Sequence, residues 1–197
     1  TKVELTNCHV NGGTISGRGV TGIGGLIGWT GGWPGNTSIK IDGCSVQNCQ
    51  ISGDGSVGAL IGHAGSNSAA YHTVTNCTVT GNQLSSTNIG AWRVGALVGT
   101  ANSGTLIVDK ATVDAAKNNN LQQGTLEDAS LEDGLLGRAV LGTTGLVMIA
   151  GKVVGAGEDT VAMIGTTQYP SIQDAVNAAK DNDTVRLVKD VTLNEGV

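Results

Sequence analysis

Gly25-Leu26-Ile27-Gly28 is a phrase that this chain repeats. Related tetrapeptides occupy residues 59–62 (Ala-Leu-Ile-Gly), 96–99 (Ala-Leu-Val-Gly) and, in altered form, 134–137 (Gly-Leu-Leu-Gly). The last glycines of the four phrases stand at positions 28, 62, 99 and 137, which gives steps of 34, 37 and 38 residues. Periods of this length are typical of solenoid proteins, in which each repeat forms one coil that stacks on the next.

Two further patterns recur with the same period. A cysteine stands two residues before a valine three times, and an aliphatic residue followed by serine comes five residues after each valine, at 15–16, 51–52 and 84–85. In the fourth unit, Ala111 takes the cysteine position and Asn118 takes the aliphatic position. We expect the matching positions to form ladders through the stack. These structural ladders are Cys8, Cys44 and Cys77; Leu26, Leu60 and Leu97; and Gly28, Gly62 and Gly99.

The composition favours a narrow interior filled by small residues. The 197 residues include 32 glycines and no phenylalanine, and aromatic residues make up 3% of the chain. Short alternating strands with glycine or asparagine at the corners would fill such an interior with stacked aliphatic side chains. The sequence therefore predicts a mainly β fold, a right-handed parallel β-solenoid (β-helix) of about three to four coils, over residues 1–142.

From about residue 143 the pattern changes to plain apolar runs at 146–149 and 161–164. A helix is expected after Ser171, which suits the N-cap position with Asp174 three residues on. One apolar face of this helix would consist of Ile172, Ala175, Val176 and Ala179. Strands are expected at 184–188 and 191–193. Residues 143–197 are thus predicted to form a small C-terminal α/β segment that caps the stack or starts a further module.

The charge distribution argues against two classes of partner. The net charge is −5, and residues 1–105 hold three acidic and four basic residues, against thirteen acidic and seven basic residues in 106–197. No basic stripe follows from this pattern, so nucleic acid is not an expected partner. No apolar run approaches the length of a membrane span, so no direct membrane insertion of this segment is expected.

The repeated Gly-x-Leu-[Ile/Val]-Gly phrase resembles the GLUG motif of bacterial cell-surface proteins, over roughly residues 1–140. This resemblance implies an extracellular β-solenoid module of a secreted or surface-anchored, adhesin-like protein, and it implies no catalytic residues. Residues 164–176 and 183–185 are similar to the opening of pectin-lyase-like β-helix modules in large surface proteins, where a strand and a helix cap the helix end. Host glycans and surface or matrix proteins are the partners that such a module would meet.

The cysteines favour reduced thiols in a stack. Coils in register lie about 4.8 Å apart, and a buried free cysteine packs as a small hydrophobe. That spacing also suits a disulfide, so a bridge between Cys44 and Cys77 is the alternative. Cys49 aligns with Gly13 and Asn82 near a turn, which makes it the expected exposed thiol.

Four aromatic residues form the candidate ligand-binding set: Trp29, Trp33, Tyr71 and Trp92. All of them fall in or beside loops rather than at the ladder positions, and exposed rings can stack on sugars or anchor a protein partner. The alternative is structural, with Trp29 and Trp33 covering an open end of the stack and Trp92 packing under its own loop.

Catalysis is the competing class of function. A polysaccharide lyase or glycoside hydrolase of the β-helix type would use the acidic segment with Glu127, Asp128, Glu132 and Asp133, which could also bind calcium. The segment lacks the residue pattern of a calcium-binding loop, and no two histidines have the spacing of a pair of metal ligands. His9 is expected at an outward-facing position of a strand. We therefore expect no catalytic residue, no metal and no cofactor. The third possible function is that of a spacer alone.

Open coil ends at Thr1 and near Val140 would expose unpaired strand edges. The sequence therefore also predicts association that increases with concentration.

Overall fold

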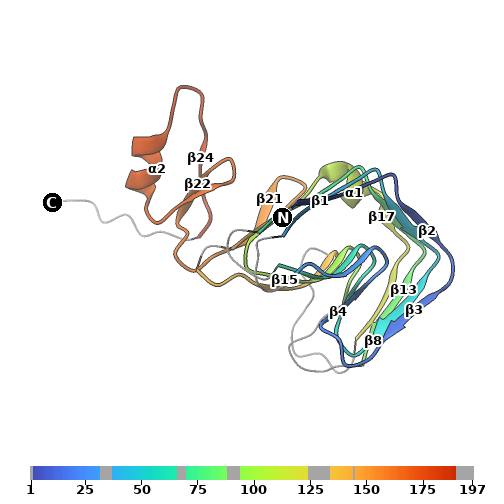
Figure 1. Cartoon of the computed structure of the whole chain (residues 1–197). Coiled ribbons are helices and arrows are strands. Elements are labelled where there is room, and N and C mark those ends of the chain that lie inside the picture. Colours follow the sequence, from blue (N-terminus) through green and yellow to red (C-terminus); the bar gives the residue numbers. More distant parts are fainter. Residues whose placement is uncertain are drawn as a thin grey trace.

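The computed structural model describes residues 2–31, 37–65, 70–87, 94–123, 134–143 and 145–189. Over these residues the chain is a parallel β-solenoid, which confirms the predicted fold class (Figure 1). Viewed along the stack, strands of successive coils lie behind one another and outline a bent cross-section with two arms.

Each of the first three coils contains five short strands. In coil 1 they are β1 (Lys2–Thr6), β2 (His9–Asn11), β3 (Thr14–Gly17), β4 (Gly22–Gly24) and β5 (Ile27–Trp29). In coil 2 they are β6 (Ser38–Asp42), β7 (Ser45–Gln47), β8 (Gln50–Gly53), β9 (Ser56–Gly58) and β10 (Ile61–Ala64). In coil 3 they are β11 (Tyr71–Thr75), β12 (Thr78–Thr80), β13 (Gln83–Ser86), β14 (Val94–Gly95) and β15 (Val98–Asn102). Corresponding strands pair in parallel, so the stack has five sheets, which we number first to fifth in chain order.

The sequence repeats coincide with the register of these sheets. Ile27, Ile61 and Val98, the third residues of the repeated phrase, are direct partners in the fifth sheet. The preceding leucines are joined through the backbone, because the N–H of Leu26 donates to the carbonyl of Leu60 at 3.3 Å and the N–H of Leu60 donates to that of Leu97 at 3.0 Å. The leucine ladder is therefore confirmed.

Glycine is required in the phrase because the fourth and fifth sheets approach each other through their backbones. A Cβ atom on Gly62 would lie 2.2 Å from the backbone nitrogen of Ile23, and one on Gly99 would lie 2.6 Å from that of Val57. Residues 59–60 form the bend between β9 and β10, and Leu60 is fully buried there. The phrase thus builds the inner corner of each coil, with glycine backbones in contact and leucine in the core.

The cysteine ladder is also confirmed, and all four cysteines are free. Cys44 and Cys77 are buried, whereas Cys8 is exposed because its coil is the first of the stack. The Sγ atoms of Cys44 and Cys77 each donate to a carbonyl two residues earlier, at 3.5 and 3.2 Å. Burial raises the pKa of Cys77 to about 11, which keeps its thiol protonated at neutral pH.

The prediction that Cys49 is the exposed thiol is wrong. Its register with Gly13 and Asn82 is as expected, since the neighbouring residues Thr14, Gln50 and Gln83 pair directly. The corner position points inward, however, and Cys49 is 1% exposed. Its N–H donates to Oδ1 of Asn82 at 3.0 Å, and its Sγ donates to the carbonyl of Gln47 at 3.1 Å. Gly13, Cys49 and Asn82 therefore occupy a second ladder of corner positions, next to the ladder of Cys8, Cys44 and Cys77.

Thiol labelling checks this assignment. A bulky maleimide in excess is expected to modify one cysteine, Cys8, in the dilute native protein and four in denaturant, because only the first coil leaves its thiol exposed. Mass spectrometry of digested protein gives the position of the label. Modification of Cys49 in the native state would contradict the inward corner.

The fourth coil departs from the predicted alignment because it contains a helix. α1 (Lys110–Asp114) stands where a strand was expected, and Asp109 caps it by accepting from the N–H of Thr112 at 2.8 Å. The extra turn shifts the register by three residues, so Val79 pairs with Ala116 rather than with Val113. The strands of this coil are β16 (Thr105–Val108), β17 (Ala116–Lys117), β18 (Asn120–Gln123) and β19 (Leu136–Val140).

The shift also corrects the expectation for the aliphatic mark of the fourth unit. Leu121, and not Asn118, is the partner of Leu84 in the third sheet. Leu136 pairs with Val98 in the fifth sheet, so the altered phrase at 134–137 restores the register. The pattern is thus kept in three dimensions where it looks lost in the sequence.

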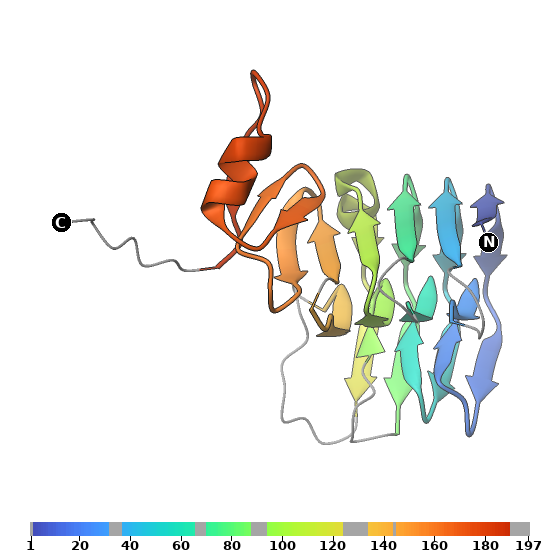
Figure 2. The same ribbon diagram turned by 60° about the vertical axis from the view of Figure 1, so that its left-hand side comes forward.

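The first sheet continues past residue 142. β20 (Leu146–Ile149) pairs in parallel with β16, and β21 (Lys152–Ala156) closes the sheet as an antiparallel strand. Beyond it, β22 (Ala162–Ile164) lies between β23 (Thr167–Tyr169) and β24 (Val185–Leu187) in a separate antiparallel sheet. Figure 2 shows this small unit beyond the last coils of the stack.

The predicted helix of this unit is confirmed as α2 (Ile172–Ala178). The hydroxyl of Ser171 accepts from the N–H of Asp174 at 3.0 Å, as its N-cap role requires. Of the expected apolar face, Ala175 is fully buried, whereas Val176 is 51% exposed. The predicted strand at 191–193 lies outside the described residues.

Candidate ligand-binding surfaces

Two of the four candidate aromatic residues fall within the described part of the chain. Trp29 at the end of β5 is 50% exposed, and Tyr71 at the start of β11 is 43% exposed. Trp33 and Trp92 lie outside the described residues. Trp29 belongs to the fifth sheet and Tyr71 to the first sheet, so the structure does not bring these two rings into one site.

Tyr71 borders a hollow on the outer face of the first sheet. Side chains alternate along β11, where His72 and Val74 point inward and Tyr71 and Thr73 point outward. The hollow has a volume of about 310 Å³ and is lined by Lys2, Ser38, Ile39, Lys40, Tyr71 and Thr73. It therefore combines one aromatic ring with hydroxyl groups and two ammonium groups drawn from three neighbouring coils.

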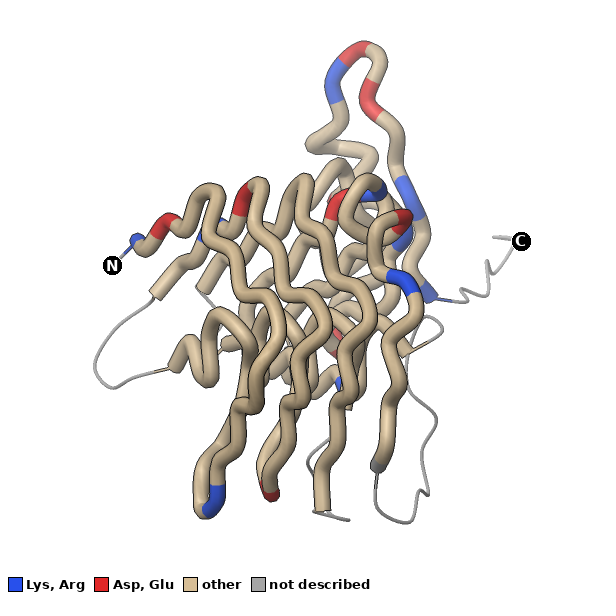
Figure 3. The backbone as a smooth tube through the Cα atoms, turned by 90° about the vertical axis from the view of Figure 1, so that its right-hand side faces the viewer, with Lys and Arg blue, Asp and Glu red and all other residues tan. Residues whose placement is uncertain are grey.

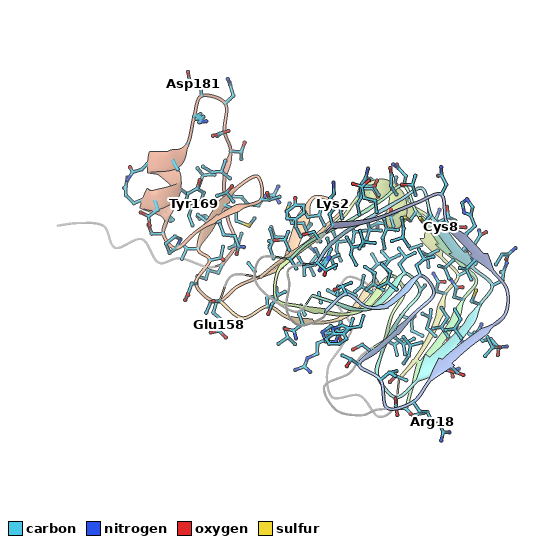
Figure 4. All side chains as sticks on the ribbon, viewed as in Figure 1. Lys2, Cys8, Arg18, Glu158, Tyr169 and Asp181 are labelled. Atoms are coloured by element: carbon cyan, nitrogen blue, oxygen red, sulfur yellow. The ribbon has the colours of Figure 1, made fainter. Side chains whose placement is uncertain are left out.

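Backbone pairing fixes the position of these groups. Tyr71 lies next to Ser38 in the register of the sheet, and its N–H donates to the hydroxyl oxygen of Ser38 at 3.1 Å. Lys40 and Thr73 are direct partners two residues further along the strands. Because parallel strands on both sides hold β6, this floor is rigid. Lys2, on the outermost strand β1, borders the same face (Figure 4).

Carboxylates balance the lysines of the hollow. Nζ of Lys2 lies 2.6 Å from Oε1 of Glu4, and Nζ of Lys40 lies 3.7 Å from Oδ2 of Asp42. The hydrogen bond and charge of Lys2 lower the pKa of Glu4. Hydrogen bonds from the Thr75 hydroxyl and the Asn76 amide lower the pKa of Asp42. The lysines of the hollow are thus paired with carboxylates that lie outside its lining, and the lining itself combines mainly apolar surface with hydroxyl groups.

Trp29 stands at the head of a different row. In the fifth sheet, Trp29 pairs with His63, His63 with Thr100 and Thr100 with Arg138. His63 is 6% exposed, and burial lowers its pKa. Thr100 shares a 2.7 Å hydrogen bond with Ser56 of the fourth sheet. Trp29 therefore stands at the first-coil end of a row in which His63 and Thr100 are buried.

A larger hollow, missed by the sequence analysis, lies at the lower corner of the coils, where Figure 4 labels Arg18. It measures about 670 Å³ and is lined by Ser16, Gly17, Arg18, Ser52, Gly53, Asp54 and Thr87. Both carboxylate oxygens of Asp54 accept hydrogen bonds from the backbone N–H of Gly19, at 2.9 and 2.8 Å. Ser16 and Ser52, the serines of the aliphatic-serine pattern, line this hollow. Their outward position could have been predicted from the sequence, because alternate residues of a strand face opposite sides and the aliphatic neighbour faces the core.

The outer face of the second and third sheets is almost free of charge. Figure 3 shows Lys, Arg, Asp and Glu gathered along the edges of this face. Serine, threonine, asparagine and glutamine follow one another through the coils, as in the row Thr14, Gln50, Gln83 and Asn120. His9 is exposed here, as expected, 2.9 Å from the hydroxyl of Ser45.

His72 is a buried histidine at a position where the neighbouring strands of the first sheet carry aliphatic residues. It pairs with Ile39 and Leu106 in the first sheet and is 1% exposed. Nε2 lies 3.5 Å from the hydroxyl of Thr30, and Nδ1 is buried without a hydrogen-bond partner among the described residues. Burial lowers the pKa of His72 to about 4. The neutral side chain packs as part of the core.

The carboxyl groups with shifted pKa values ionise more readily than usual. Besides Glu4 and Asp42, this holds for Asp109, where burial acts to raise the pKa and hydrogen bonds from Thr112 and Asn76 outweigh it. A general acid for glycoside cleavage needs the opposite shift. The described residues hold no group of three or more metal-ligating side chains, and the acidic segment with Glu127, Asp128, Glu132 and Asp133 lies outside them.

No family model, no curated protein and no solved structure matches this chain. Among the helices that the structure describes, none has both the length and the apolar character needed to cross a membrane.

Proposed function

We propose that the chain is a non-catalytic repeat module that binds a glycan at the Tyr71 hollow of its first sheet. One observation carries this proposal: an exposed aromatic ring borders a mainly apolar hollow on a paired sheet, together with hydroxyl and ammonium groups that come from three coils. The C–H face of a sugar stacks on such a ring, and neighbouring donors and acceptors fix its hydroxyl groups.

The size and charge of the hollow limit the ligand. A volume of about 310 Å³ is at the lower end for ligand sites and suits one or two sugar units of a longer chain. The lysines already face carboxylates, so the site has no excess charge to recruit a polyanion. Display outside a bacterial cell, as in an adhesin, is part of this proposal and is supported by the resemblance of the repeated phrase to the GLUG motif.

Substituting Tyr71 tests the proposal. An immobilised panel of glycans and host matrix proteins is first used to find a glycan that retains the protein. Tyr71→Ala is then expected to bind this glycan about tenfold more weakly, because removal of a stacking ring commonly costs more than 1 kcal/mol. Isothermal titration with the same glycan in soluble form gives the affinity.

Trp29→Ala is the matched control, since it removes an equally exposed ring from another sheet. It should leave the affinity unchanged. Equal binding by wild type and Tyr71→Ala, a loss confined to Trp29→Ala, or retention by no glycan of the panel would each contradict the site. A role for Trp33 and Trp92 stays a prediction of the sequence.

A further inference from the structure

The larger hollow, which we call the Arg18 hollow, is a second place where polar groups of neighbouring coils converge. Its volume of about 670 Å³ lies within the range of small-molecule sites. Ser52 and Asp54 of coil 2 line its centre, and coils 1 and 3 supply Arg18 and Thr87 on either side. The hollow thus lies along the side of the stack, across three coils (Figure 4).

Strand pairing and a glycine fix the floor of this hollow. β8 is paired with β3 on one side and with β13 on the other, and Ser52 is the direct partner of Ser16. Next to Ser52, a Cβ atom on Gly53 would lie 2.4 Å from both the carbonyl oxygen of Gly17 and Cδ1 of Ile23. Only glycine fits at this position, so the floor is backbone packed directly against the core.

Arg18 and Asp54 give the hollow one positive and one negative group, so its lining has no net charge. They occupy matching places in their coils, one residue after the partners Gly17 and Gly53. The N–H of Gly19 orients the Asp54 carboxylate by donating to its two oxygens. A carboxylate has about four acceptor positions, so Asp54 can accept further hydrogen bonds from a ligand, whereas the Arg18 guanidinium offers only donors.

We propose that the Arg18 hollow is a second binding site of the module and holds a neutral sugar unit of a glycan. A sugar hydroxyl both donates and accepts, so neighbouring hydroxyls of one ring can donate to Asp54 and accept from Arg18. The hydroxyls of Ser16 and Ser52 add donors and acceptors at the floor. An anionic or a cationic ligand would meet a like charge in this hollow, whereas a neutral sugar would not.

NMR titration of the isotope-labelled chain tests the site. The neutral probes are tetrasaccharides of glucose, xylose, mannose and N-acetylglucosamine, and oligogalacturonate and oligomeric glucosamine are the anionic and cationic probes. At least one neutral probe is expected to shift the amide signals of Gly19 and Gly53, because Gly19 is hydrogen-bonded to Asp54 and Gly53 lines the hollow. Shifts with no neutral probe, or tighter binding of a charged one, would overturn the proposal.

Charge substitutions test the roles of the two groups. Arg18→Gln and Asp54→Asn are each expected to bind the same neutral tetrasaccharide at least about tenfold more weakly, because each loses a charged hydrogen-bonding group. Asp54→Asn keeps an oxygen that accepts from Gly19. The two variants should change preference in opposite directions, Arg18→Gln towards oligomeric glucosamine and Asp54→Asn towards oligogalacturonate. Unchanged affinity and preference in both variants would reject the site.

Two control variants separate this site from other effects. Lys117→Gln removes an exposed charge of β17 outside the hollow and should bind like the wild type. Tyr71→Ala lies on the first sheet and should leave the shifts of Gly19 and Gly53 unchanged. Shifts at Thr73 without shifts at Gly19 would reject only the Arg18 hollow, and the reverse would reject only the Tyr71 hollow, so the two proposals fail independently.

Discussion

Gly62→Ala is expected to destabilise the protein by about 3 kcal/mol or more, because the added methyl group meets backbone rather than a movable side chain. Its Cβ would lie 2.2 Å from the nitrogen of Ile23 and 2.7 Å from the carbonyl oxygen of Gly28. Strands of neighbouring coils hold both groups, so neither can move away alone. Urea unfolding followed by circular dichroism gives the change in the free energy of unfolding.

Gly28→Ala is the matched control, at the same repeat position of the first coil. Its Cβ would meet only the carbonyl of Gly22 within 3 Å, at 2.9 Å, and among the described strands β5 is paired on one side alone, with β10. A loss of about 1 kcal/mol is expected there. If the two substitutions cost the same, the close approach of the fourth and fifth sheets is not the reason for the repeated glycine.

The free energy of unfolding is expected to fall by about 3 kcal/mol between pH 6.5 and pH 4 because of His72. Its pKa is lowered from 6.5 to about 4 by burial. Below pH 6.5 the His72 side chain of the unfolded chain binds a proton, whereas that of the folded chain stays neutral until about pH 4. The free energy of unfolding is therefore highest above pH 6.5 and decreases as the pH falls through this range. Burial lowers the pKa of His63 too, which adds in the same direction.

His72→Leu isolates this effect, because Leu106 fills the same position one coil further on. The variant is expected to unfold at nearly the same urea concentration at pH 4.5 and pH 7 once the contribution of His63 is allowed for. Urea titrations at several pH values measure the difference. Parallel pH profiles for wild type and His72→Leu would show that His72 is not held neutral in the core.

The stacking of the coils could be predicted from sequence because three marks recur together. Each mark fixes a different wall of the coil: the cysteine corner, the aliphatic mark at Ile15 in the third sheet and the leucine bend before the fifth sheet. Identical spacing in consecutive repeats places identical residues on top of one another, and parallel in-register pairing then follows. The N-cap at Ser171 was equally readable, since it depends on local chemistry.

The errors arose where one pattern fits two structures. Lys-Ala-Thr-Val at 110–113 resembles the cysteine mark, yet Asp109 caps it as a helix, and this local hydrogen bond decides the outcome. Cys49 was placed at a turn correctly, but the direction of a corner side chain depends on how the coil bends around its core. Asn82, in the same position one coil further on, is also buried in the structure, so the inward direction holds for both coils.

The candidate site was only partly readable. An aromatic residue beside a repeat mark suggests exposure, and both Trp29 and Tyr71 are exposed. That they belong to different sheets, and that Lys2, Lys40 and Ser38 surround Tyr71, depends on the register between coils and on which face of each strand looks outward. These relations need the three-dimensional stack.

Binding without catalysis is the central claim, and one incubation tests it most directly. The protein is mixed with each soluble glycan of the panel, and the bound fraction and the newly formed sugar ends are measured in the same sample. We expect at least one glycan to bind, through Tyr71, with no product released over hours. Release of sugar products that survives Tyr71→Ala and stops in Asp128→Asn or Glu132→Gln would contradict the account and identify a polysaccharide-degrading enzyme.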